Sequence, residues 1–125
     1  MSDIVDERLA KEEKERRISV EIKRLTGLFK KMNQDTKKVV KSLITNAAFM
    51  AITLEDLQEH IAINGVTDKY QNGENQWGVK KSPQVEIYNT MVKNHASIMK
   101  QLADLMPKHT QKPEGDGFDD FVNER

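Results

Sequence analysis

The stretch LFKKMNQDTKKVV, residues 28–40, decides the fold, because it holds a helix stop and a helix start within a few residues. Asn33, Asp35 and Thr36 belong to the residue types that cap a helix N-terminus with a side-chain oxygen. Apolar residues at helical spacing both precede and follow the stretch. So short a connection between two helices predicts an antiparallel helical hairpin.

The first helix is predicted over residues 3–31. The run KEEKERR, residues 11–17, is wholly charged, so the first turns are expected to project into solvent. Gly27 is expected to weaken the helix by about 1 kcal/mol relative to alanine without ending it. The apolar residues that form one face of its second half are Ile18, Ile22, Leu25, Phe29 and Met32.

A second helix is predicted over residues 35–64, with Asn64 and Gly65 forming its C-terminal cap. At 1.5 Å per residue this helix is about 45 Å long. Thr53 and Asp56 offer an alternative, a cap that divides the helix into two halves. The predicted apolar stripe comprises Val39, Leu43, Ala47, Met50, Leu54, Leu57 and Ile61.

A third helix is predicted over residues 82–106, with Ser82 as N-cap, Pro83 at the first helical position and Pro107 as the stop. Its apolar positions recur at alternating spacings of three and four, a pattern that favours packing against another helix. They are Val85, Tyr88, Val92, His95, Met99, Leu102 and Met106.

Residues 65–81 are predicted to be a loop with a tight turn at Asn72-Gly73. The alternative is a short hairpin that pairs Val66 with Val79, although the flanking alternation of apolar and polar residues is poor. This loop holds the only tryptophan, Trp77. Because tryptophan removes so much surface from water, Trp77 is expected to anchor the loop on its own subunit or on a neighbouring one.

These elements predict an all-α fold: a long antiparallel helical hairpin plus a third amphipathic helix. Residues 1–108 form one helical domain, and residues 109–125 form a flexible acidic tail. Apolar residues make up 37% of the chain and charged residues 32%, a balance that favours long exposed helices whose subunits share a core. A homo-oligomer is therefore expected, and a head-to-tail interface closes into a ring.

The net charge is zero, yet residues 23–41 contain seven basic residues and one acidic residue, which gives +6. A helical hairpin brings these residues to one end, and concentrated positive charge is typical of nucleic-acid binding. The alternatives are a solvated helix end and a helix-turn-helix motif whose second helix begins at Asp35. We call the following residues the basic belt: Lys23, Arg24, Lys30, Lys31, Lys37, Lys38 and Lys41.

Nothing in the sequence predicts an enzyme, a metal site or a cofactor. There is no cysteine, the three histidines are far apart, and NGENQWG lacks the phosphate-binding Gly-rich pattern. No stretch approaches the roughly 20 apolar residues of a membrane-spanning helix, and the N-terminus lacks a signal-peptide pattern. The sequence thus predicts a soluble intracellular protein with no membrane partner.

About half of the chain, from AAFMAITLEDLQEHIAING (47–65) to YQNGENQWGVKKSPQVEIYNTMVKNHASIMKQLADLMPK (70–108), resembles small terminase subunits of tailed bacteriophages that infect low-GC Gram-positive bacteria. The N-terminus departs from the pattern of small terminases because it has no separate winged or homeodomain-like module. The resemblance is carried by Asn64-Gly65, Tyr70, Asn72-Gly73, Gln76, Gly78, Lys80, Ser82-Pro83, Tyr88-Asn89, Met91 and Lys100-Gln101-Leu102.

The resemblance implies a non-enzymatic, ring-forming helical protein in the cytoplasm of the bacterial host. Such a protein recognises the viral packaging site on double-stranded DNA and delivers the DNA to a large terminase subunit, which carries ATPase and nuclease activities. A coiled-coil adaptor or scaffold that binds only protein is the alternative. In the tail, the alternative to partner docking is a segment that folds back onto its own subunit or stays disordered. The predicted docking residues for a protein partner are Phe118, Asp119, Asp120, Phe121 and Val122.

Overall fold

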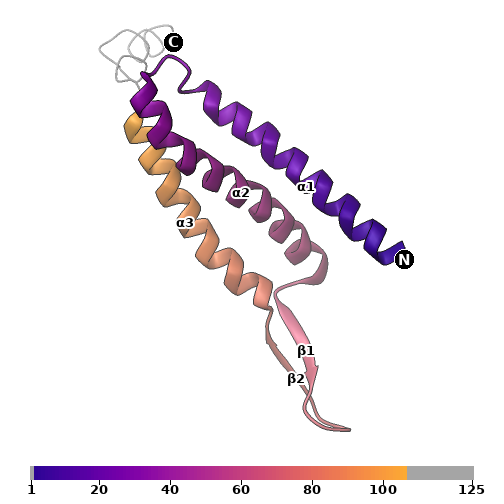
Figure 1. Cartoon of the computed structure of the whole chain (residues 1–125). Helices are drawn as coiled ribbons and strands as arrows, with labels where there is room; N and C mark the ends of the chain where they lie inside the picture. Colours follow the sequence, from indigo (N-terminus) through magenta and orange to yellow (C-terminus); the bar gives the residue numbers. More distant parts are fainter. Residues whose placement is uncertain (1, 107–125) are drawn as a thin grey trace, which may run out of the picture.

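The computed structural model describes residues 2–106, which form three helices and one two-stranded antiparallel sheet (Figure 1). In Figure 1, α2 lies between α1 and α3, and the sheet extends away from the helical body as a β-hairpin. The predicted helical hairpin with a third helix is confirmed, with this small sheet added. The elements are α1 (Ser2–Gly27), α2 (Gln34–Asn64), β1 (Thr67–Gln71), β2 (Trp77–Lys81) and α3 (Pro83–Leu105).

Both ends of α2 are capped as predicted. The Asn33 side-chain oxygen accepts a hydrogen bond from the backbone N–H of Thr36 at 2.8 Å. Gly65 adopts a φ of +79° and donates its N–H to the Ile61 carbonyl at 2.7 Å. The helix runs through Thr53 without a break, so the alternative of two shorter helices is wrong.

The predicted extension of α1 to residue 31 is wrong, because the helix ends at Gly27. The backbone then continues through tight turns in which the N–H of Leu28 donates to the Leu25 carbonyl and that of Phe29 to the Thr26 carbonyl. These turns curve the chain so that the Phe29 ring enters the core. Burying this ring outweighs the extra helical turn that Gly27 already disfavours.

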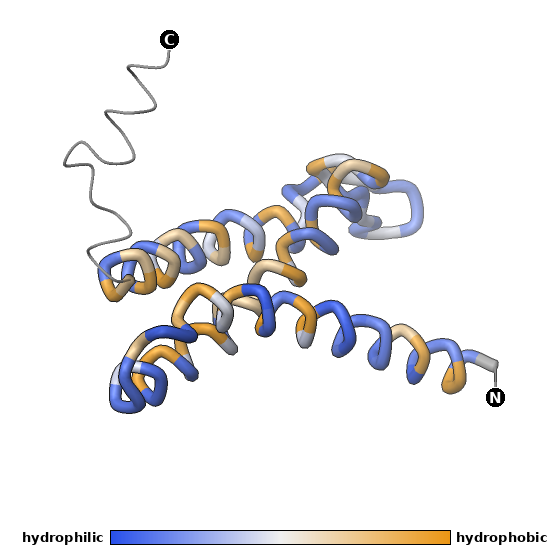
Figure 2. Tube along the Cα trace, turned by 90° about the horizontal axis from the view of Figure 1, so that it is seen from above, coloured by the Kyte–Doolittle hydropathy of each residue, from blue (hydrophilic) through white to orange (hydrophobic). Residues whose placement is uncertain are grey.

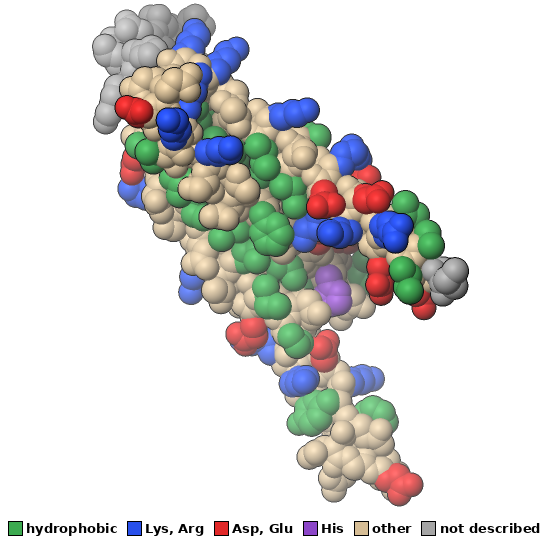
Figure 3. All heavy atoms as spheres, in the orientation of Figure 1, with side chains coloured by type: hydrophobic (Ala, Val, Ile, Leu, Met, Phe, Trp, Pro, Cys, Tyr) green, Lys and Arg blue, Asp and Glu red, His purple; other side chains and the backbone are tan. Residues whose placement is uncertain are grey.

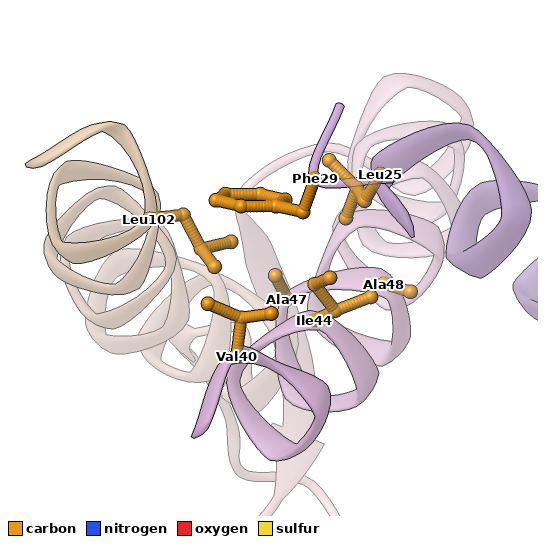
Figure 4. Close-up of a cluster of buried hydrophobic side chains, with 7 residues drawn as sticks. All are labelled: Leu25, Phe29, Val40, Ile44, Ala47, Ala48 and Leu102. Carbon is orange, nitrogen blue, oxygen red and sulfur yellow. The ribbon is translucent and has the colours of Figure 1, made fainter. Parts of the chain in front are cut away.

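The hydrophobic core lies at the end of the body where α1 turns into α2. Figure 4 shows the Phe29 ring between Leu102 of α3 and Leu25 of α1, with side chains of α2 beneath it. Phe29 is only 2% exposed. The core cluster comprises Leu25, Phe29, Val40, Ile44, Ala47, Ala48 and Leu102.

The predicted apolar stripe of α2 is partly wrong in phase. Ala47 and Leu54 are buried as expected, but Val40 is buried while Val39 is 59% exposed. The reason is that α2 packs against α1 on one side and α3 on the other, so its buried positions do not follow one stripe. Its buried residues are Val40, Ile44, Ala47, Ala48, Ile52 and Leu54.

The N-terminal half of α1 extends beyond the core, and charged contacts hold the middle of the helix. Residues 3–13 are exposed, and Figure 2 shows this half as mostly hydrophilic. Arg17 donates to Asp56 at 2.8 Å and to Glu55 at 2.7 Å, both on α2. Lys14 lies 3.8 Å from the Asp56 carboxylate and 5.1 Å from the centroid of the Phe49 ring. These contacts clamp the middle of α1 to α2.

Arg17→Ala is expected to loosen α1 by about 1 kcal/mol, because a half-exposed bidentate contact between two helices is worth more than a single exposed pair. Hydrogen exchange of the amides of residues 3–20 measures this loosening. Arg16→Ala is the matched control, since among residues 2–106 the ion-pair partner of Arg16 is Glu13 on its own helix. Equal exchange in the two variants would contradict the clamp.

Candidate nucleic-acid interface

The structure places the whole basic belt at the turn end of the helical hairpin. Lys23 and Arg24 lie near the end of α1, Lys30 and Lys31 lie in the turn, and the other three lysines lie in the first turns of α2. The blue side chains at the upper end of Figure 3 show this gathering of positive charge. The helical stop and start at residues 28–40 therefore position the charges, as the sequence predicted.

Most of this charge is unneutralised within residues 2–106. Arg24 is the one member of the basic belt that forms an ion pair with a described residue; the six lysines form none there. All seven side chains are exposed except Lys37, which is half-buried. Six ammonium groups at one end of a rod-like body form a surface that attracts a polyanion.

Arg24 is the member of the belt least available to a ligand. Its guanidinium donates two hydrogen bonds to the Glu21 carboxylate, at 2.9 and 2.6 Å. These bonds, with the attraction between the charges, lower the pKa of Glu21 and raise that of Arg24. The half-buried Glu21 carboxylate thus holds the Arg24 guanidinium against α1.

A groove between α1 and α2 opens directly beside the belt, with a volume of about 290 Å³. We call it the turn groove. Its floor is apolar and includes the buried Phe29, while two lysines of the belt, Lys37 and Lys41, lie on its rim. The pattern of residues did not predict this groove, which depends on how the two helices splay. Its lining comprises Ile22, Thr26, Phe29, Lys37, Val40, Lys41, Ile44 and Thr45.

Residues 65–81 form a β-hairpin rather than the predicted loop, and its register differs from the one considered, because Val79 pairs with Lys69 and not with Val66. Gly73, at a φ of +136°, makes the turn that Asn72-Gly73 predicted. Tyr70 faces Gly78 across the strands, where a Cβ would lie 2.5 Å from the ring. The absence of a side chain at Gly78 therefore leaves room for the Tyr70 ring.

The expectation that Trp77 anchors this segment on its own subunit is wrong. Trp77 lies on β2 and is 67% exposed, because the hairpin projects beyond the helical body. Packing of the Trp77 side chain on a neighbouring subunit stays a prediction. Tyr70 and Val79 are also exposed, and Lys80 Nζ lies 5.9 Å from the centroid of the Tyr70 ring. The hairpin therefore carries a second exposed surface, both apolar and basic.

Trp77→Ala is expected to change the free energy of unfolding of the single chain by no more than about 0.5 kcal/mol, as for other exposed positions. Chemical denaturation at low protein concentration measures this value. If the side chain packs on a neighbouring subunit, the same variant shifts the mass distribution in light scattering toward smaller species. A large loss of stability in a monomeric sample would mean that Trp77 is buried in its own chain.

Within residues 2–106 no helix is long and apolar enough to cross a membrane. No group of three or more His, Asp or Glu side chains in the same part of the chain is placed to hold a metal ion. The predicted docking residues of the tail, 118–122, lie outside the described residues. Comparison of the chain with protein-family models, curated proteins and solved structures found no match.

Proposed function

We propose that this chain is a non-enzymatic DNA-binding protein of the small-terminase type, whose basic belt contacts the phosphates of duplex DNA. The observation that carries the proposal is the set of six lysines at the turn end, none of which has an ion-pair partner among residues 2–106. The sequence resemblance to small terminases supports the same conclusion. The large terminase subunit is then the partner to which the DNA is delivered.

Phosphate contact explains the arrangement better than solubility does. Charges kept for solubility are usually interspersed in sign, whereas residues 23–41 hold seven cations against one anion, Asp35. Like charges at one end of the body repel one another, and a bound polyanion relieves that repulsion. Contacts of this kind position DNA without selecting its sequence.

We further propose that the protein works as a homo-oligomer. Large apolar side chains are exposed on every element of the single chain, which exceeds the scattered exposure expected of a monomer. Some of them belong to α1 and the β-hairpin, the two parts that project from the core. Those more than half exposed are Ile4, Val5, Leu9, Val20, Val39, Ile63, Val66, Trp77 and Val79. Neighbouring copies in a ring would cover them.

The second candidate function is a protein-binding adaptor or scaffold. The same exposed apolar side chains favour it, because a partner protein covers them as well as a second copy does. The two candidates differ in the role of the lysines, since an adaptor uses them only for solubility. Binding to DNA therefore decides between them.

The test is a titration of labelled duplex DNA with the full chain at several salt concentrations. The affinity is expected to fall steeply with salt, with a log-log slope of about −0.9 for each phosphate neutralised. Several lysines in contact give a slope of several units. No binding at low salt, or binding that ignores salt, would favour the adaptor.

Light scattering of the purified chain tests the oligomer separately. We expect a mass that is a multiple of the 14.4 kDa chain at micromolar concentration and moderate salt. A mass equal to a single chain would contradict the proposed ring while leaving DNA binding open.

A further inference from the structure

We infer that the turn groove is occupied by the C-terminal segment of the same chain, residues 118–122, with the sequence FDDFV. The groove has an apolar floor and a rim of two lysines. The segment has the complementary composition, because Phe118, Phe121 and Val122 are apolar and the two residues between the phenylalanines are aspartates. The same segment thus offers apolar side chains to the floor of the groove and carboxylates to the lysines on its rim.

The lining of the groove favours the apolar side chains of a peptide over a polar small-molecule ligand. Its volume is about 290 Å³. It offers Thr26 and Thr45 at its edge and no histidine or carboxylate in its lining. A groove lined in this way suits the insertion of apolar side chains from an extended or helical segment.

The position of the chain end makes the contact reachable. Leu102 belongs to the core cluster and Met106 packs against it, so the described chain ends beside the same core that underlies the turn groove. The eleven residues 107–117 reach up to about 36 Å when extended. Passing around the ends of two helices, each about 10 Å wide, requires about 20 Å.

Charge also favours this occupant. Residues 109–125 contain two basic and five acidic residues, which gives −3, whereas residues 23–41 carry +6. The tether keeps the tail at a high effective concentration near the groove, so a weak contact is enough to fill it. Asp119 and Asp120 would then pair with Lys37 and Lys41.

One consequence, which rests on the proposed function, is that the tail competes with DNA for the two rim lysines. Phe118→Ser with Phe121→Ser should then raise the affinity of the full chain for duplex DNA several-fold. DNA, by occupying the lysines, would release the segment for a protein partner.

The docking itself is tested without DNA, by cross-linking cysteines in a chain that has none of its own. One variant carries Thr45→Cys at the groove edge and Asn123→Cys next to the docking segment. The matched control carries Ser97→Cys on α3 with the same Asn123→Cys. Ser97 is exposed and closer along the chain to the start of the tail, so random encounters favour the control.

Under mild oxidation the groove pair is expected to form an intrachain disulfide at least about tenfold faster than the control pair, a population shift of 1.4 kcal/mol or more. Adding Phe118→Ser with Phe121→Ser should reduce the rate to that of the control, at unchanged helix content by circular dichroism. Equal rates for the two pairs, or a rate that ignores the serine substitutions, would overturn the inference. Disulfides found only between chains would overturn it too, because the occupant would then be another copy's tail.

Discussion

Phe29→Ala is expected to lower the free energy of unfolding by about 3–5 kcal/mol, the usual cost of removing a buried phenylalanine ring. The ring is 2% exposed and contacts all three helices through the core cluster, so no single neighbour closes the cavity that its removal leaves. A domain of this size is stable by only about 5–15 kcal/mol. Denaturant titration at fixed protein concentration measures the loss.

Phe49→Ala is the matched control, because it removes the same side chain from a position that is 48% exposed. We expect a loss of about 1 kcal/mol there, mainly from the contact with Lys14. Similar losses in the two variants would mean that the turn end does not hold the main core. Phe29→Leu, which keeps most of the apolar volume, should recover much of the stability.

Lys37→Glu with Lys38→Glu is expected to weaken binding to any duplex DNA by about tenfold or more at moderate salt. If both lysines contact phosphates, the log-log salt slope should fall by roughly 1.8 per bound subunit, since each contact contributes about 0.9. The two new carboxylates also repel the phosphates. Fluorescence anisotropy of labelled DNA of two unrelated sequences measures both quantities.

Lys11→Glu with Lys93→Glu is the charge-matched control, because both lysines are exposed and lie outside the basic belt. It changes the net charge by the same amount, yet it should leave the slope nearly unchanged, because the slope reports phosphate contacts and these lysines lie outside the belt. If the belt variant retains DNA as well as this control does, the belt is the wrong surface.

The helices were predictable because their ends carry local signals. Asn33, Gly65 and Ser82 each satisfy or terminate a helix end through contacts within a few residues. The position of the basic belt followed from the same signals, since a hairpin turn brings residues 23–41 together whatever the side-chain packing.

The predictions that were wrong depend on contacts between residues that are distant in the sequence. The end of α1 depends on whether the Phe29 ring is buried, and the phase of α2 depends on its having helices on two sides. Trp77 was expected to be buried because of its large apolar surface. Its burial, however, depends on where its segment lies relative to the rest of the molecule. The turn groove, formed by residues from two helices, has no signature in either helix alone.

Lysine footprinting of the full chain tests most directly whether the basic belt faces DNA. Mild acetylation with and without duplex DNA, followed by mass spectrometry, reports the reactivity of each lysine. We predict that DNA protects the lysines at 23, 30, 31, 37, 38 and 41 and leaves Lys11, Lys93 and Lys100 reactive. Unchanged reactivity at the turn end under conditions in which DNA is bound would contradict the account.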